Sequence, residues 1–207
     1  LGAEFRQDED NDSYFLDGEK LRGAYILMEE ISVTGTANLV MTACLINGTT
    51  TIYNAACEPY LQQLCTMLNG MGAKIEGIGS NRLKIQGVHS MGGMTHTILP
   101  DFIEVGSFIG LAAMTQSTLA IEGVSKEQLG IIPSVFERIG IELKFEDEKL
   151  IIPAQDFYEI QQFIDGSILT IYDAPWPGFT PDLLSVVLVV STQAKGCVLI
   201  HQKMFES

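Results

Sequence analysis

The chain has 207 residues, of which 46% are hydrophobic, enough for one large or two small domains with a buried core. Its 12 Lys and Arg side chains are outnumbered by 26 Asp and Glu, and the net charge of −14 argues against a nucleic-acid partner bound through a basic face. The longest apolar stretch, residues 183–190, is much shorter than the roughly 20 residues of a membrane span, so no membrane partner is predicted.

The first recognisable element is a strand pair at residues 5–7 and 14–16, which flank an acidic turn at residues 8–12. Such a run of like charges is typical of the solvated tip of a hairpin. The sequence therefore predicts a β-hairpin at the start of the chain.

A full unit follows, in the order β-α-β-α-β-β. Residues 49–53 are mostly β-branched, as strands prefer, while apolar residues at helical spacing mark the helices. The expected elements are strand 24–28, helix 36–46, strand 49–53, a helix from Glu58-Pro59 to Asn69-Gly70, and a hairpin of strands 73–76 and 82–86.

The same order is expected again in the second half of the chain. Asp101 is a candidate N-cap for the first helix, and Ser125 with Gln128 forms a capping-box pattern for the second. The expected elements are strand 94–98, helix 103–114, strand 118–122, a helix from Ser125, and a hairpin of strands 141–145 and 149–152. A third, shorter unit has strand 168–172, helix 182–192 and strand 197–201. Since complete units end in hairpins, we expect an α+β fold of mixed sheets with helices on one face.

A five-residue pattern supports this repeat. The sequence LGAEF at residues 1–5 reappears as MGAKI at 71–75 and, more loosely, as IGIEL at 139–143. The glycines lie 70 residues apart (from 2 to 72) and 68 apart (from 72 to 140), a period that is typical of a small subdomain used several times. At residues 71 and 139 the pattern closes a helix, but at residue 1 no helix precedes it. We therefore expect an internal fragment of a longer protein.

Two loops are candidate functional sites. Residues 31–36 lie between a strand and a helix, where small side chains let backbone amides approach an anion; alternatively, Ser32 or Thr34 is an ordinary N-cap. Residues 173–182 contain three prolines, a Trp and a Gly, which is typical of a rigid loop, and end at Asp182. Asp182 is either a general base or a helix cap. Nothing local makes Glu206, near the end of the chain, functional.

The chain contains four cysteines and three histidines. The cysteines form no CxxC pair, which favours reduced thiols in a cytoplasmic protein. The histidines have no ligand-like spacing, so the sequence predicts no metal site.

Several motifs, ordered and spaced as in the family, resemble UDP-N-acetylglucosamine enolpyruvyl transferases: residues 48–56 (GTTTIYNAA), Glu58-Pro59, residues 71–75, Leu99-Pro100-Asp101, Ile103-Glu104 and residues 175–179 (PWPGF) through Asp182. The resemblance covers nearly the whole chain. It implies an inside-out α/β barrel fold of six β-α-β-α-β-β units in two halves, with the active site between them. Here the fold would be incomplete, with residues 1–99 ending the first half and residues 100–207 starting the second.

The same resemblance assigns roles to single residues. Glu30, Ile31, Ser32 and Val33 match the segment that holds the uridine diphosphate. Asp182 matches the aspartate proposed to deprotonate the sugar 3-hydroxyl, Met204 a backbone contact to the nucleotide sugar, and Glu206 a glutamate near the phosphoenolpyruvate pocket. Three residues depart from the family pattern: Glu30 replaces a frequent lysine, Thr34 a common glycine and Cys57 a frequent arginine.

The resemblance implies an enzyme of peptidoglycan biosynthesis without a cofactor, whose full-length form uses UDP-N-acetylglucosamine and phosphoenolpyruvate. The family's reactive cysteine and its phosphoenolpyruvate-binding cations lie outside residues 1–207, so we expect the fragment alone to be inactive. Its cut edges are expected to favour a homo-oligomer. The alternatives are a shikimate-pathway enolpyruvyl transferase and a non-catalytic nucleotide-binding module.

Overall fold

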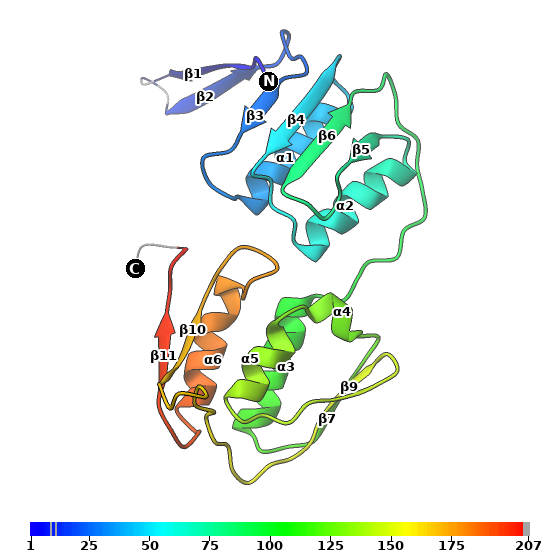
Figure 1. Ribbon diagram of the computed structural model, residues 1–207. Helices are drawn as coiled ribbons and strands as arrows, with labels where there is room; N and C mark the ends of the chain where they lie inside the picture. The colour runs from blue at the N-terminus through cyan, green and yellow to red at the C-terminus, as the bar shows by residue number, and fades with distance from the viewer. Residues whose placement is uncertain (9, 11, 205–207) are drawn as a thin grey trace. The chain divides into compact units, whose positions relative to one another are not determined.

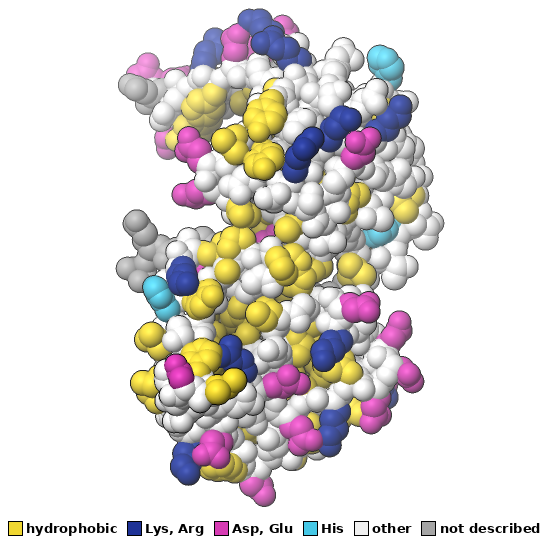
Figure 2. Space-filling model, in the orientation of Figure 1, with side chains coloured by type: hydrophobic (Ala, Val, Ile, Leu, Met, Phe, Trp, Pro, Cys, Tyr) yellow, Lys and Arg dark blue, Asp and Glu magenta, His cyan; other side chains and the backbone are white. Residues whose placement is uncertain are grey.

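The chain folds into two units, Leu1–Ile98 and Leu99–Ser207, in a computed structural model that describes residues 1–8, 10 and 12–204. The first unit opens with a hairpin of β1 (Glu4–Asp8) and β2 (Ser13–Asp17), which pair antiparallel as expected. Phe5 lies opposite Leu16 in this hairpin and stacks on Tyr14, and all three side chains are exposed. Hydrophobic side chains also reach the surface in this region of the space-filling view (Figure 2). The hairpin thus carries an uncovered apolar face.

The body of the first unit is a four-stranded mixed sheet in the order β3-β4-β6-β5 (Figure 1). Strand β3 runs parallel to β4, and the other neighbours are antiparallel. Helices α1 and α2 cover one face of it. The bounds are β3 (Tyr25–Leu27), α1 (Val33–Cys44), β4 (Thr49–Tyr53), α2 (Pro59–Gly70), β5 (Lys74–Glu76) and β6 (Arg82–Gln86).

Alternation along the strands explains why the helices cover only one face. In β6, Leu83 and Ile85 are buried, while Arg82, Lys84 and Gln86 are exposed. The buried set packs with α1 and α2 into one hydrophobic cluster, and the polar set faces solvent. The β-α-β-α-β-β order predicted for residues 24–86 is therefore confirmed.

The second unit contains two separate sheets. Strands β7, β9 and β8 form an antiparallel sheet in that order, and β10 pairs parallel with β11. Its helices and strands are α3 (Phe102–Met114), β7 (Leu119–Glu122), α4 (Lys126–Leu129), α5 (Ile132–Arg138), β8 (Lys144–Glu146), β9 (Lys149–Ile152), β10 (Leu169–Tyr172), the 3-10 turn η1 (Pro181–Leu183), α6 (Leu184–Ser191) and β11 (Val198–His201).

Two glycines allow the helices of this unit to approach closely. A Cβ at Gly106 would lie 2.4 Å from the Leu183 side chain, and one at Gly110 would lie 2.5 Å from Val186. Helix α3 therefore packs directly against η1 and α6. Around this contact, a single hydrophobic cluster joins the helices to both sheets.

The predicted strand at residues 94–98 is wrong. The segment has no strand partner, and Ile98 is 72% exposed. The segment instead contacts α2: Gln63 donates a side-chain hydrogen bond to the Thr97 carbonyl at 3.1 Å, and a Cβ at Gly70 would lie 2.5 Å from the Met94 sulfur. An extended segment needs a neighbouring strand to satisfy its backbone, and none of the described residues pairs with it as a strand.

The helix expected from Ser125 is divided in two. The Ser125 N–H does donate to the Gln128 side chain at 3.2 Å, as the capping pattern predicts. Gly130 then takes a φ of +54° and ends α4, after which α5 begins at Ile132. A side chain at Gly130 would also collide with Trp176, because its Cβ would lie 2.4 Å from the ring. The break therefore makes room for the loop that follows β10.

Within the described residues, no helix has the length and apolar content that crossing a bilayer requires. All four cysteines are free thiols. The assignment of the two units to two halves of a longer protein stays a prediction.

Candidate functional site

The first candidate place is the loop between β3 and α1. Ser32 has an extended backbone (φ −118°, ψ 124°), and its Oγ accepts a hydrogen bond from the Gly35 N–H at 3.1 Å. The ordinary N-cap alternative is therefore correct for the Ser32 side chain, and Thr34 is not the cap. This leaves the backbone amides at the start of the helix, rather than the hydroxyl, to contact a ligand.

The buried hydroxyl of Thr36 anchors this loop. Thr36 is fully buried, and its Oγ1 donates to the Ser32 carbonyl at 2.6 Å and accepts from the Ala56 N–H at 3.0 Å. The first bond lies within α1, whereas the second joins the helix to the chain that follows β4. Thr36 therefore ties the candidate loop to a neighbouring strand connection.

Asn54 holds the other end of the loop. Its backbone has a φ of +62°, which asparagine tolerates better than most residues, and its side-chain amide donates to the Met28 carbonyl at 3.0 Å. The Met28 N–H in turn donates to the Tyr53 carbonyl at 3.0 Å. Because β3 and β4 are parallel, their carboxyl ends lie side by side, and the residues after β4 can reach the loop after β3. The loop is thus fixed at both ends.

The loop before α1 combines partial positive charge from the helix N-terminus with negative charge from two glutamates. The first amides of a helix have no intrahelical acceptor and carry the positive end of the helix dipole, so the N–H groups of Val33 and Thr34 are available to an anion. Glu29 and Glu30, which are exposed, precede them and contribute negative charge. The arrangement therefore suits a ligand held by directed backbone hydrogen bonds rather than by bulk charge.

The second candidate place is the proline-rich loop after β10. It closes on itself through hydrogen bonds from the Ala174 N–H to the Phe179 carbonyl at 2.9 Å and from the Gly178 N–H to the Pro175 carbonyl at 2.8 Å. The Trp176 ring lies 5.6 Å from the Phe102 ring, at the start of α3. The loop is held in place, as its composition predicts.

Asp182 lies at the end of this loop, inside η1. The residue before the turn is Thr180, and no side-chain hydrogen bond caps it, so the alternative that Asp182 is a helix cap is wrong. Its side chain is exposed, and among the described residues none forms a hydrogen bond or ion pair with its carboxylate. A general base needs such a free carboxylate, within hydrogen-bond reach of the proton that it removes.

A residue that the sequence analysis did not select lies at the start of the same loop. Asp173 is 1% exposed, and its two carboxylate oxygens accept hydrogen bonds from the backbone N–H groups of Lys203 and Met204. The sequence signal was an acidic residue at the end of an apolar strand, but its partners lie 30 and 31 residues away. Met204 is thus placed beside the loop, while Glu206 falls outside the described residues.

The predicted site residues that the structure describes are divided between its two units. Glu30, Ile31, Ser32 and Val33 lie on the loop of the first unit, and Asp182 and Met204 lie in the second unit. Among the described residues, no group of three or more acidic, His or Cys side chains gathers as metal ligands.

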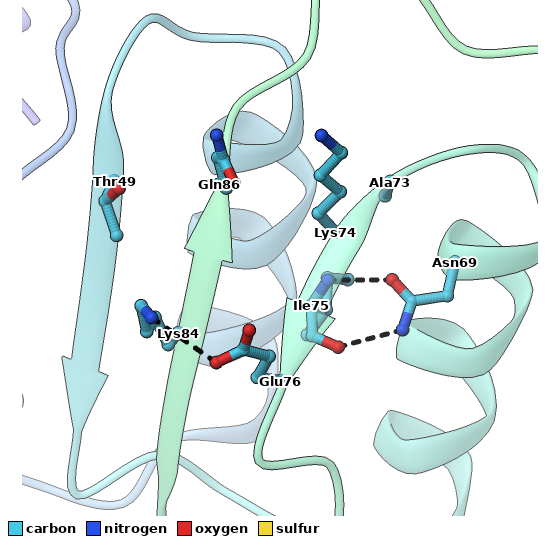
Figure 3. A pocket seen from close by; sticks show the side chains of 8 residues that line it. All are labelled: Thr49, Asn69, Ala73, Lys74, Ile75, Glu76, Lys84 and Gln86. Carbon is cyan, nitrogen blue, oxygen red and sulfur yellow. Dashed lines mark hydrogen bonds and ion pairs between the residues drawn. The ribbon is translucent and has the colours of Figure 1, made fainter.

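A cavity of about 380 Å³ on the open face of the first sheet is less suitable (Figure 3). Several of its polar groups are engaged with one another: the Asn69 side chain exchanges two hydrogen bonds with the Ile75 backbone, at 2.8 and 2.9 Å, and Lys84 pairs with Glu76 at 3.4 Å. The remaining lining side chains, Thr49, Ala73, Lys74 and Gln86, include no predicted site residue.

The fold is that of the enolpyruvyl transferases. The solved enolpyruvyl transferase NikO from Streptomyces tendae superposes with a TM-score of 0.81 at 18% identity, over 97% of this chain and 48% of that one. An EPSP synthase from Acinetobacter baumannii superposes with a TM-score of 0.67 at 14% identity, over 97% and 45%. At these identities, the likeness concerns the fold alone.

The family follows from the sequence match. All residues from 1 to 207 match the family model described as EPSP synthase (3-phosphoshikimate 1-carboxyvinyltransferase), and the chain belongs to this family. It is also similar to proteins named UDP-N-acetylglucosamine 1-carboxyvinyltransferase, at 65% identity in Bacteroides thetaiotaomicron, 64% in Bacteroides fragilis and 63% in Porphyromonas gingivalis. Each match covers all of this chain and 48% of the relative, so the chain spans about half the length of these proteins. The resemblance drawn from the sequence motifs is confirmed.

Proposed function

We propose that these residues form the central part of an enzyme that moves the enolpyruvyl group of phosphoenolpyruvate to the 3-hydroxyl of UDP-N-acetylglucosamine, with release of phosphate. The observation that carries this proposal is the 63–65% identity, over all 207 residues, to proteins named for that transfer. The enzyme would serve peptidoglycan synthesis in the cytoplasm, without a cofactor.

In this proposal, the loop before α1 binds the uridine diphosphate. Val33 and Thr34 offer backbone N–H groups at the helix N-terminus, and Thr36 and Asn54 hold the loop in place before the ligand arrives. A loop that is already ordered loses less conformational entropy on binding. Glu30, Ile31 and Ser32 complete the segment, with Glu30 oriented away from the phosphates because like charges repel.

Asp182 is the proposed base that removes the proton of the sugar 3-hydroxyl. Its carboxylate is exposed and unpaired among the described residues, and the rigid proline-rich loop fixes its position. Met204 contacts the nucleotide sugar through its backbone. Glu206 lies outside the described residues, and its proposed role near phosphoenolpyruvate comes from the family resemblance alone. Over the whole transfer, the sugar oxygen forms a bond to C2 of phosphoenolpyruvate, the bond from C2 to the phosphate oxygen breaks, and the phosphate that leaves carries away the equivalent of the hydroxyl proton.

The test uses the full-length enzyme with Asp182→Asn, which keeps the size of the side chain and removes the base. We expect turnover to fall by about 10²–10⁴-fold, the usual contribution of a positioned acid or base, with little change in affinity for UDP-N-acetylglucosamine. Asp156→Asn is the matched control, because Asp156 is also exposed in the second unit and is expected to leave turnover unchanged. Near-normal turnover of Asp182→Asn would remove Asp182 from the mechanism.

A shikimate-pathway enolpyruvyl transferase is the second candidate, because the matching family model carries the name of that reaction. Offering the full-length enzyme shikimate 3-phosphate in place of UDP-N-acetylglucosamine separates the two, since phosphate release requires the correct acceptor. A non-catalytic nucleotide-binding module would bind a uridine nucleotide and release no phosphate with either acceptor.

We also propose that the 207 residues self-associate when separated from the rest of the enzyme. Exposed large apolar side chains on the first hairpin and on α3 and α6 would be covered in a second copy. These side chains are Phe5, Tyr14, Phe15, Leu16, Phe108, Leu111, Met114, Leu188 and Val189.

A further inference from the structure

Asp173 is a buried carboxylate with two backbone partners. It follows β10 directly, is 1% exposed, and accepts from the N–H groups of Lys203 and, at 3.1 Å, Met204. Each carboxylate oxygen accepts a hydrogen bond from one N–H group, so both oxygens have a partner. A carboxylate that is removed from water in this way is stable only if such bonds replace its hydration.

The position of these bonds matters more than their number. β10 and β11 run parallel with Tyr172 opposite His201, so Asp173 and the residues after His201 leave the same end of the two-stranded sheet. The Lys203 ammonium lies 3.3 Å from the centre of the Tyr172 ring, which holds the same segment a second time. The chain after β11 is therefore pinned to the start of the proline-rich loop.

This arrangement links the two parts of the second unit that carry its proposed site residues. Asp173 opens the loop that ends at Asp182, and its carboxylate fixes the backbone of Met204. The position of the Met204 backbone relative to the start of this loop is then set by one side chain. A shift of about 1 Å in a catalytic arrangement can lower the rate about 100-fold.

We propose that Asp173 is a positioning residue, whose carboxylate holds the segment of Lys203 and Met204 against the proline-rich loop and so sets Met204 for catalysis. It does not touch the substrate. The proposal rests on the proposed function, because the role of Met204 belongs to it.

The experiment compares the full-length enzyme with its Asp173→Asn variant. Asparagine has the same size but only one acceptor oxygen, so its amide nitrogen faces one of the two backbone donors. We expect kcat/KM for UDP-N-acetylglucosamine to fall about 10- to 100-fold, and amide hydrogen exchange at residues 203 and 204 to become faster. If this variant does not fold, Asp173→Ser, which keeps one acceptor, replaces it.

Tyr158→Phe is the control for lost stability. Tyr158 is buried in the same unit and donates to the Ala113 carbonyl at 2.9 Å, away from the segment after β11, so its loss lowers stability without moving Met204. The proposal is supported if kcat/KM is normal for Tyr158→Phe and reduced for the Asp173 variant when the two variants have the same folded fraction. Normal kinetics of the Asp173 variant, or unchanged exchange at residues 203 and 204, overturns it.

The exchange measurement also separates this proposal from the proposed function. If the unaltered full-length enzyme transfers no enolpyruvyl group, the proposed function fails, and with it the catalytic part of the inference. Exchange at residues 203 and 204 would still show whether Asp173 anchors the segment.

Discussion

Replacing Thr36 by valine removes a buried hydroxyl while keeping the size and branching of the side chain. The Ala56 N–H, on a residue that is 1% exposed, then loses its acceptor. The Ser32 carbonyl keeps its bond from the Thr36 N–H at 2.9 Å, so only one buried group is left without a partner. An unsatisfied buried donor costs about 1–3 kcal/mol, and valine leaves no cavity, so we expect a loss of stability in that range.

Thr42→Val is the matched control on the same helix. Thr42 also donates to the carbonyl four residues earlier, Asn38, at 2.8 Å, but this bond is exposed and no other N–H depends on the hydroxyl. A surface change of this kind usually alters stability by no more than about 0.5 kcal/mol. The comparison therefore isolates the bond between α1 and the segment after β4.

Amide hydrogen exchange is the assay, because a chain of two units need not unfold in one step. A loss of about 1–3 kcal/mol corresponds to about 5- to 150-fold faster exchange at Ala56. Exchange in the second unit should not change. If Thr36→Val and Thr42→Val have equal effects, or if exchange at Ala56 is unaltered, then Thr36 does not anchor the candidate loop.

Three further predictions concern the 207-residue chain itself. Incubated with phosphoenolpyruvate and UDP-N-acetylglucosamine, the chain should release no more phosphate than a blank without protein. Negative charge that develops in the transition state needs positioned cations, and we propose that these cations lie elsewhere in the full-length enzyme. Phosphate release clearly above the blank would refute this prediction. Light scattering at micromolar concentration should give at least twice the monomer mass of 22.7 kDa, and a monomer at every concentration would contradict the proposed apolar contacts. Burial raises the pKa of the Cys65 thiol to about 11, whereas Cys197 is exposed. Iodoacetamide at pH 8 should therefore modify Cys197 first and Cys65 much later, because the thiolate is the reactive form. Equal rates of modification, measured by mass spectrometry, would refute the buried position of Cys65.

The roles of single residues that come from the family resemblance remain predictions. The motifs that carry the resemblance are short and local, and they are visible in the sequence without any knowledge of pairing. What the structure adds is the state of each group. The Ser32 hydroxyl caps helix α1, and the Asp182 carboxylate is exposed and caps no helix. The backbone N–H of Met204 donates a hydrogen bond to Asp173.

Local chemistry was enough to predict most elements. Strands β4 and β6 have the predicted bounds, and Asp101 caps α3 by accepting from the Ile103 N–H at 2.8 Å. These features depend on residues within a few positions of one another: β-branched runs, alternation, and side chains that bond to the next turn of the backbone. The order β-α-β-α-β-β of residues 24–86, and with it the α+β class, could therefore be predicted from the sequence alone.

Partners that are distant in the sequence decided the rest. Residues 94–98 have the alternation of a strand but meet no neighbouring strand, and Gly130 ends a helix where Trp176 requires space. Asp173 acquires its importance only from amides 30 and 31 residues later. A hydrogen bond or a packing contact of this kind exists only when the chain has already brought both groups together, so its presence depends on the tertiary structure and not on the pattern around either residue.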